Sequence, residues 1–552
     1  MLLPKIVGID LDNTIINYND AFIFTTTKLN LLSREWCKSN LLSGNGISQK
    51  NLIKKAILNK KNGQRNWECL QGQVYGNFIQ YAHIFSGVAN FLFHCKNRGI
   101  EVFIISHKTK FGHYDKSKIP LRKAAINFLK QNNILTKNYG LSKERVFFLD
   151  TREKKVKKIR DLKCDYFIDD LPEVFSEPNF PKNTKKIVFS PTDQISYNDT
   201  FNNWRKINEY FFNDIKPIDI SGYVEFGLKK PVKTVNKIKG RANSTIFKIE
   251  MQMGQKYVGK LYPDNTNNNR KRLENEIKAY KFMHLNKIDC VANNIWFDCN
   301  LNFGLFEWIN GSKIKNVNNK IIVEALSFIK SLALLSKITN YNNFEMASAA
   351  CLSGKMIENQ IWDRFKKIDN YSYTFSELNN FLNNDLLPSF EKILKKSKKL
   401  WPNDFNYQLE RINQILSPSD FGFHNAIHYK NGIKFFDFEY FGWDDPVKLT
   451  CDFMLHPGMK ITNKQKFFWF QTMNEIFKSD KNFQKRIIAS YELYGLCWCL
   501  INLNVYLKID WTKKNYKEKE KQVLEEKKYL QLEKSRELLK HINSDEQKWA
   551  TL

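Results

Sequence analysis

Two acidic motifs stand in opposite halves of this chain of 552 residues. The first is Asp10–Thr14, with the sequence Asp-Leu-Asp-Asn-Thr, and it has a later counterpart in Asp169-Asp170. The second is Ser419–Asn425, which is followed by Asp437. Carboxylates grouped in this way hold Mg²⁺ against phosphate groups. The chain must therefore fold so that each group converges, and its length allows roughly two to four domains.

The composition favours a folded, soluble protein. Hydrophobic residues make up 42% of the chain and aromatic residues 14%, which is enough for several cores. The formal net charge is +30, but the lysines are spread along the chain, as on solvated surfaces, and they would also steer small anionic substrates. Cysteines stand singly apart from Cys497 and Cys499, and no apolar run is long enough to span a membrane. We therefore expect a cytoplasmic protein with reduced thiols, no membrane segment and no dedicated nucleic-acid function.

Short apolar runs alternate with helical patterns in the first part of the chain. The runs predicted as buried strands are Lys5–Ile9, Glu101–Ser106, Val146–Leu149 and Tyr166–Ile168. Strands separated by helices predict a parallel sheet, whose ligands bind at the carboxyl ends of the strands. Asp10, Ser106 and Asp169 all fall at such ends.

The later part of the chain has a different pattern. Thr245–Glu250 and Lys256–Leu261 predict an antiparallel hairpin around Gly254, and residues 320–506 are mainly helical. We therefore predict an α/β domain followed by an α+β domain with a small β-rich lobe and a helical lobe. The predicted boundaries are 1–195 for the first domain with a helical cap at about 15–90, 196–225 for a linker, 226–510 for the second domain and 511–552 for a charged helix.

The Asp-x-Asp-x-Thr pattern directly after a buried strand resembles the first motif of the haloacid dehalogenase (HAD) superfamily of phosphatases. The resemblance implies that Asp10 attacks phosphorus and forms an aspartyl-phosphate. It also implies that Asp12 protonates the leaving oxygen and later activates water. A lone Asp after a strand can equally cap the next helix, so the assignment to this superfamily depends on the motifs that follow.

Three further segments match this superfamily in order. Val102–Ser106 resembles the second motif, in which the Ser106 hydroxyl binds the phosphoryl group. Thr151–Val156 supplies the lysine of the third motif, for which Lys155 is preferred and Lys154 is a close rival. The resemblance implies a Mg²⁺ site formed by Asp10, Asp12 and Asp169, with Asp170 assisting.

The second acidic motif resembles the catalytic and metal motifs of the kinase superfamily, and is closest to aminoglycoside phosphotransferases and choline kinases. The resemblance implies that Asp420 orients the substrate hydroxyl and accepts its proton, and that Asn425 and Asp437 hold the Mg²⁺ of ATP. The His-Gly or His-Arg that usually precedes the base in these families is replaced by Pro418-Ser419. His424 lies between base and ligand, where a lone histidine is more often a packing or hydrogen-bonding residue than a ligand.

Upstream residues fit the same resemblance. Lys260 would bind the nucleotide phosphates and pair with Glu276, with Glu274 as the alternative. Glu307 and Ile309 lie in the segment that resembles the adenine-contacting connector, and 240–244 would cover the nucleotide. Gly254–Lys260 also spells the start of a P-loop, but Leu261 lacks the required hydroxyl and the context is a hairpin.

The sequence thus predicts a bifunctional, Mg²⁺-dependent and ATP-dependent enzyme for small molecules. It would hydrolyse a phosphate monoester at one site and phosphorylate a hydroxyl at the other, with a phosphorylated sugar for surface polysaccharide or nucleotide-sugar synthesis as the conjectured substrate. One alternative is a nucleic-acid end-processing phosphatase and kinase, favoured by the basic charge. Another makes one half a regulatory pseudoenzyme. Oligomeric state stays open.

Overall fold

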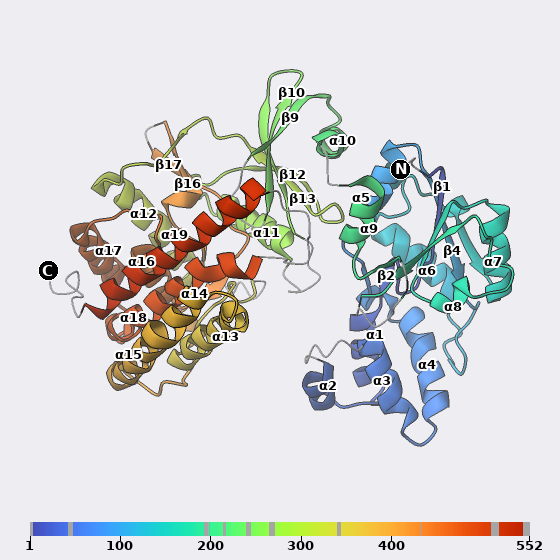
Figure 1. The fold of residues 1–552 in the computed structure, drawn as a ribbon, viewed down its shortest axis with the longest axis horizontal. Helices are drawn as coiled ribbons and strands as arrows, with labels where there is room; N and C mark the ends of the chain where they lie inside the picture. Colours follow the sequence, from blue (N-terminus) through green and yellow to red (C-terminus); the bar gives the residue numbers. More distant parts are fainter. Residues whose placement is uncertain are drawn as a thin grey trace. The chain divides into compact units, whose positions relative to one another are not determined.

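The computed structural model describes residues 4–41, 48–191, 197, 199–213, 217–238, 244–263, 271–338, 344–430, 432–508 and 518–544. Figure 1 shows the ribbon of these residues. They belong to two compact units. The first unit contains Met1–Leu273 and Asn294–Trp308, and the second contains Glu274–Asn293 and Ile309–Leu552. The covering loop predicted at 240–244 lies outside the described residues except for Ser244.

A six-stranded sheet forms the centre of the first unit, with the order β5-β4-β1-β6-β7-β8. Every neighbouring pair in it is parallel, which confirms the predicted mixed α/β fold with a parallel sheet. Buried Val and Ile residues dominate β1, as expected for a strand covered on both faces. The strands are β1 (Ile6–Ile9), β4 (Glu101–His107), β5 (Val146–Leu149), β6 (Tyr166–Asp169), β7 (Lys185–Phe189) and β8 (Thr200–Phe201).

The register of this sheet brings the polar strand ends together. Ile9 of β1 lies opposite Ile104 of β4 and Ile168 of β6. The backbone N–H of Asp10 donates to the carbonyl of Ile168 over 2.9 Å, which extends the ladder one residue further. Asp10 and Asp169 therefore leave the sheet at the same edge.

Four helices form an insertion between the short antiparallel strands β2 (Ile16–Asn17) and β3 (His83–Ile84). Figure 1 draws this group in blue. Apolar residues at helical spacing face inward on each helix, such as Ile53 and Ile57, and the rings of Phe22 and Trp67 stack at 5.5 Å. The helices are α1 (Asn19–Lys28), α2 (Arg34–Leu41), α3 (Gln49–Leu58) and α4 (Gly63–Tyr75).

The first unit also contains an antiparallel sheet with the order β12-β13-β11-β10-β9. The predicted hairpin is confirmed, because β10 and β11 pair antiparallel and Gly254 adopts a φ of 84° in the turn between them. This strand-turn-strand context excludes a P-loop. The strands are β9 (Val232–Ile238), β10 (Thr245–Met251), β11 (Lys256–Leu261), β12 (Asn294–Asp298) and β13 (Phe303–Glu307).

Buried polar contacts join the helices of the parallel sheet to this second sheet. The Asn90 side chain donates to the Leu301 carbonyl over 3.0 Å and to the Tyr223 hydroxyl over 2.9 Å. The range predicted as a linker, 196–225, contains β8, a complete helix and most of another. The remaining helices of the unit are α5 (Val88–Asn97), α6 (Leu121–Gln131), α7 (Arg152–Asp161), α8 (Pro172–Phe175), α9 (Trp204–Phe212) and α10 (Pro217–Leu228).

The second unit is mainly helical, and its central helix α18 (Phe483–Asn502) contacts α13, α15, α16 and α19. The charged C-terminal helix buries Leu532 and Leu539, and its Ser535 hydroxyl donates to the Cys499 carbonyl over 2.9 Å. The other helices are α11 (Arg272–Leu285), which belongs to this unit from Glu274 onward, α12 (Asn319–Ile338), α13 (Gly354–Ser372), α14 (Ser376–Asn380), α15 (Leu387–Leu400), α16 (Pro446–Leu455), α17 (Asn463–Ile476) and α19 (Glu518–Asn543).

Two small sheets in the second unit carry the second acidic motif. β15 pairs with β18, and β16 pairs with both β14 and β17, all antiparallel. The strands are β14 (Ser312–Lys313), β15 (Ile415–Ser417), β16 (Ala426–Tyr429), β17 (Gly432–Phe435) and β18 (Gly442–Asp444). Within the described ranges, no helix combines the length and the apolar character that crossing a bilayer requires.

Candidate active sites

A carboxylate cluster lies where β1 and β6 end. Oxygens of Asp10, Asp169 and Asp170 lie within 4.8 Å of one another. The Lys155 ammonium lies 2.5 Å from Oδ1 of Asp10 and 2.6 Å from Oδ2 of Asp169. All three of these paired side chains are buried. The structure thus brings together four residues that the sequence placed in one site.

The start of α7 selects which lysine enters the cluster. The Thr151 hydroxyl accepts the backbone N–H of Lys154, a cap that sets where the helix begins. With this phase Lys155 faces inward with Val156 and Ile159, and its side chain is 2% exposed. The Lys154 side chain is 60% exposed and lies 3.6 Å from Asp150. Lys155, and not Lys154, is therefore the lysine of this cluster.

Burial and like charge shift the pKa values in the cluster. Burial raises the pKa of Asp10 to about 7; Asp169 and Asp12 add to the rise, and Lys155 opposes it. Burial, together with the charges of Asp169 and Asp10, raises the pKa of Asp170 well above its usual range. Burial would lower the pKa of Lys155, but the two carboxylates beside it raise it. Such grouped carboxylate oxygens are the ligands that Mg²⁺ takes, so these residues fit a magnesium site.

Asp12 has partners of its own, and it also adds to the raised pKa of Asp10. The Lys108 ammonium donates to both carboxylate oxygens over 2.9 and 2.8 Å, and the Tyr18 hydroxyl donates to Oδ1 over 2.8 Å. Lys108 also lies 4.6 Å from the centroid of the Tyr75 ring. Sequence reasoning missed Lys108, although its place two residues after Ser106 put it at the same strand end.

A second missed residue comes from the helical insertion. Lys50 of α3 has a raised pKa: burial would lower it, but Tyr75, Asp170 and Asp12 together raise it. The charges of Asp170 and Asp12 thus act on a lysine that belongs to the helical insertion. No spacing in the sequence links α3 to the strand ends, so only the fold could reveal it.

Two hydroxyls of the predicted motifs are buried without hydrogen-bond partners in the described part of the chain. They are the Ser106 hydroxyl at the end of β4 and the Thr14 hydroxyl after the Asp-x-Asp pair. An unsatisfied buried hydroxyl costs about 1–3 kcal/mol, so such groups call for an explanation. Ser106 and Thr14 can therefore each form a further hydrogen bond.

The second candidate site begins at Asp420, just after β15. Ser419 before it adopts a φ of 65°, a left-handed conformation that is strained for serine. The side chain of Asn425 donates to the Asp420 carbonyl over 3.0 Å, and the Asn425 carbonyl accepts the N–H of Phe436 over 3.1 Å. These bonds fix the spacing between the predicted base and the segment that carries Asp437.

Asp437 is also left-handed, with a φ of 72°, and it belongs to a second carboxylate group. Oxygens of Glu276, Asp437 and Glu439 lie within 4.8 Å of one another. Glu276 is 1% exposed and accepts the N–H of Phe438 over 3.1 Å. Glu439 was missed by the sequence reasoning, although it stands two residues after Asp437. This group also fits a divalent cation by the chemistry of its oxygens.

The other residues predicted for nucleotide binding are divided between the units. Lys260 lies on β11, buried, with its ammonium 4.7 Å from the centroid of the Tyr262 ring. Glu307 ends β13 in the first unit, and Ile309 belongs to the second. The predicted pairing of Lys260 with Glu276 stays a prediction.

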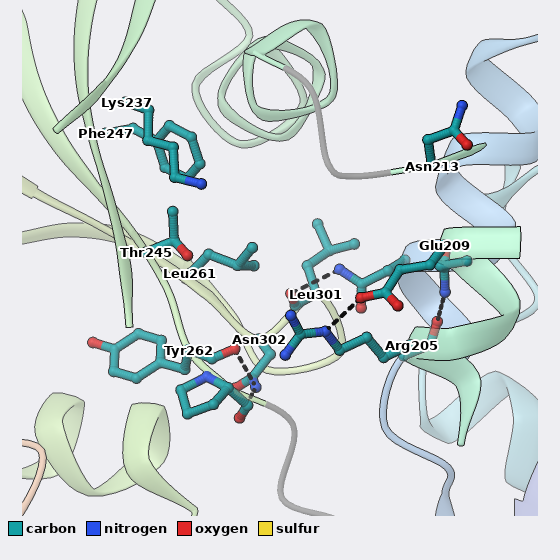
Figure 2. A pocket seen from close by; sticks show the side chains of 14 residues that line it. Arg205, Glu209, Asn213, Lys237, Thr245, Phe247, Leu261, Tyr262, Leu301 and Asn302 are labelled. Carbon is teal, nitrogen blue, oxygen red and sulfur yellow. Dashed lines mark hydrogen bonds and ion pairs between the residues drawn. The ribbon is translucent and has the colours of Figure 1, made fainter. Parts of the chain in front are cut away.

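A pocket of about 140 Å³ with a mixed polar and apolar lining lies elsewhere in the first unit. Figure 2 shows Arg205 and Glu209 on one side of it, and Lys237 and Thr245 on the other. Arg205 forms a hydrogen bond to Glu209 over 3.0 Å. The lining amides of Asn90, Asn208 and Asn302 donate to protein oxygens. This pocket contains none of the predicted site residues.

No protein-family model matches the chain, and no curated protein matches it. Several solved structures are similar to it at low sequence identity. A choline kinase from Cryptosporidium parvum Iowa II has 13% identity and a TM-score of 0.38, with 58% of this chain and 94% of that chain covered. A spectinomycin phosphotransferase in complex with ADP and spectinomycin has 12% identity and a TM-score of 0.40, with 59% and 98% covered. A choline kinase from Streptococcus pneumoniae has 14% identity and a TM-score of 0.36, with 58% and 97% covered.

Proposed function

We propose that the chain is a bifunctional enzyme that hydrolyses a phosphate monoester in its first unit and transfers phosphate from ATP to a hydroxyl at its second motif. The observation that supports this most is the position of Lys155 between Asp10 and Asp169 at two strand ends. A buried lysine that neutralises a pair of carboxylates is what a phosphoryl-binding nucleophile needs. The HAD-type assignment of this domain is part of the proposal.

The hydrolysis proceeds in two steps. An oxygen of Asp10 attacks phosphorus, the bond from phosphorus to the leaving oxygen breaks, and Asp12 gives that oxygen a proton. Asp12 then takes a proton from water, whose oxygen attacks phosphorus and releases phosphate and the Asp10 carboxylate. Lys108 and Tyr18 hold Asp12 in place, and Lys155 and Ser106 bind the phosphoryl oxygens. Mg²⁺ bound by Asp10 and Asp169 would neutralise charge on the phosphoryl group.

The transfer step uses the second motif. Asp420 accepts the proton of the acceptor hydroxyl, whose oxygen bonds to the γ-phosphorus as the bond to the β,γ-bridging oxygen breaks and ADP leaves. Asn425 and Asp437 would hold Mg²⁺ on the nucleotide phosphates, and the Glu276 and Glu439 carboxylates lie beside Asp437. Lys260, Glu307 and Ile309 are proposed to contact the nucleotide.

We propose a small molecule, such as a sugar phosphate, as the substrate. The two proposed reactions would then move phosphate between positions on a metabolite, which is the chemistry of a biosynthetic enzyme. The net charge of +30 favours the alternative of nucleic-acid ends. Steep salt dependence of oligonucleotide binding would support that alternative.

The phosphatase half is tested by trapping its intermediate. Purified protein is incubated with Mg²⁺ and radiolabelled acetyl phosphate, quenched in acid and treated with hydroxylamine. We expect label on the protein that hydroxylamine removes, as for an acyl phosphate, and no label on the Asp10→Asn variant. Equal labelling of the two proteins would exclude Asp10 as the nucleophile.

The transferase half is tested with labelled ATP. Transfer to a panel of hexoses, pentoses and their monophosphates is measured with Mg²⁺, and the Asp420→Asn variant serves as the inactive control. Wild-type transfer that Asp420→Asn retains would remove Asp420 from the role of base. An absence of transfer to any sugar of the panel would overturn the proposed sugar kinase.

A further inference from the structure

Two histidines stand beside the proposed base of the transferase site. Nε2 of His424 lies 3.1 Å from Oδ1 of Asp420. The rings of His424 and His456 are stacked, with centroids 4.1 Å apart and planes within 1° of parallel. The Asp420 side chain is 41% exposed and the His424 side chain 23%. The carboxylate is therefore open to solvent on one side and contacts an imidazole on the other.

The second histidine is fixed by its own contacts. Nδ1 of His456 accepts the N–H of Gly458 over 3.0 Å, so its hydrogen is on Nε2. The Trp498 ring meets His456 edge-on with centroids 4.7 Å apart, and its indole N–H donates to Asp452 over 2.9 Å. Burial, followed by the charge of His424, lowers the pKa of His456 to about 4. His456 thus stacks on His424 as a neutral ring.

The Asp420, His424 and His456 ligand atoms lie within 4.8 Å of one another, which raises the question of a metal. A metal ion lies in the plane of each imidazole that binds it. Two parallel stacked rings cannot both satisfy that condition for one ion. The N–H of Gly458 also occupies Nδ1 of His456 and leaves its Nε2 protonated. The geometry therefore favours a hydrogen-bonding role over a metal site.

Gly422, in the loop that carries His424, leaves room for the His424 ring. A Cβ on Gly422 would lie 2.8 Å from Nδ1 of His424 and 2.9 Å from the sulfur of Met459. The N–H of Phe423 donates to the same sulfur over 3.1 Å. A larger residue at position 422 would have to displace the His424 ring or the Met459 side chain, so glycine here leaves room for His424 beside Asp420.

We propose that His424 is a positioning residue for Asp420, an inference that rests on the proposed phosphate transfer at this site. Its Nε2–H fixes Oδ1 of the carboxylate, so that Oδ2 receives the proton of the acceptor hydroxyl. The residues before the base, Pro418 and Ser419, offer no imidazole to support the loop. His424, backed by His456, provides that support from the other side of the base.

The test uses the full chain with MgATP and the sugar of the hexose and pentose panel that is phosphorylated fastest. His424→Phe keeps a ring for stacking but donates no hydrogen bond, whereas His424→Gln can place an N–H near the position of Nε2. We expect His424→Phe to lower kcat about 10- to 100-fold with KM for ATP unchanged. His424→Gln should recover much of this loss. His428→Phe, on β16, is the matched control and should match wild type.

A double-mutant cycle separates positioning from general support of the fold. In an Asp420→Asn background His424→Phe should cost nothing further, because the group it positions is gone. Full additive loss, or a His424→Phe rate within twofold of wild type, would overturn the inference while leaving the transferase intact. If wild type phosphorylates no sugar of the panel, the proposed function and this inference fail together.

Discussion

In the first unit Asp10 and Asp169 are buried against Lys155, whereas in the second unit 41% of the Asp420 side chain is exposed and its hydrogen-bond partner is the imidazole of His424. The proposed roles account for the contrast. A nucleophile that takes phosphate onto itself needs a neutralising cation in a fixed place, and a parallel sheet supplies it. A base that only accepts a proton needs an open face for the acceptor.

The pKa shifts of the two aspartates go in opposite directions. Burial raises the pKa of Asp10 to about 7. Burial would also raise the pKa of Asp420, but the hydrogen bond from His424, with the charges of His424 and Lys448, lowers it. The pKa of an aspartate at a strand end is thus raised, whereas that of an aspartate in a loop beside an imidazole is lowered.

The largest expected effect is the loss of hydrolysis when the nucleophile is removed. Asp10→Asn should lower the Mg²⁺-dependent hydrolysis of p-nitrophenyl phosphate by at least about 10³-fold, because the covalent step has no substitute. Transfer from ATP should stay within twofold of wild type. Asp161→Asn, exposed at the end of α7, is the matched control. Loss of both activities together would show that the two sites are not separate.

Removal of the base should have a somewhat smaller effect on the other reaction. We expect Asp420→Asn to lower ATP-dependent transfer by about 10²- to 10⁴-fold, the range for a positioned general base. Hydrolysis of p-nitrophenyl phosphate should not change. The control is Asp363→Asn, an exposed residue of α13. A transfer rate that survives Asp420→Asn would assign the acidic motif a structural role.

Substitution of the two neighbouring lysines of α7 tests this contrast through the free energy of unfolding. Lys155→Met leaves Asp10 and Asp169 facing each other without a cation, and should destabilise the first unit by about 3 kcal/mol at pH 8. Lys154→Met, which removes an exposed ion pair, should change stability by less than about 0.5 kcal/mol. Urea denaturation of both variants in EDTA measures the difference. Equal effects would mean that Lys155 is not held between the carboxylates.

The smallest expected effects concern pH. Folded Asp10, with a pKa near 7, keeps a proton that the unfolded chain loses near 3.8, so its contribution to stability falls as the pH rises through this window. The lowered pKa of Asp420 acts oppositely, and its contribution is lost only as the pH falls below the usual aspartate range. Thermal unfolding in EDTA should therefore depend less on pH between about 4 and 7 in Asp10→Asn, with no such change in Asp420→Asn. The same pH profile in both variants would contradict the contrast.

The strand ends of the parallel sheet could be predicted from sequence, because buried strands show as apolar runs and their carboxyl ends meet at one edge. Asp10 and Asp169 follow this rule, and the structure places them in one cluster. The choice between Lys154 and Lys155 could not be made in this way. It depends on the phase of α7 after its Thr151 cap, and a shift of one residue turns a side chain by about 100°.

The spacing of residues along the sequence could not predict contacts between distant segments. Lys108 donates to Asp12, and the charges of Asp12 and Asp170 act on Lys50 of α3. The ring of His456 stacks on that of His424, which stands 32 residues earlier in the chain. Each contact depends on packing between elements rather than on a local pattern. The sequence favoured a packing or hydrogen-bonding place for His424, and only the fold shows that Asp420 is its partner.

The sequence by itself determined the two acidic motifs, their order along the chain and the sheet that carries the first, because local periodicity and strand polarity are written in neighbouring residues. Tertiary structure alone decided which lysine neutralises Asp10 and which imidazole meets Asp420. Those contacts depend on helix phase and on the packing of distant segments, which neighbouring residues do not specify.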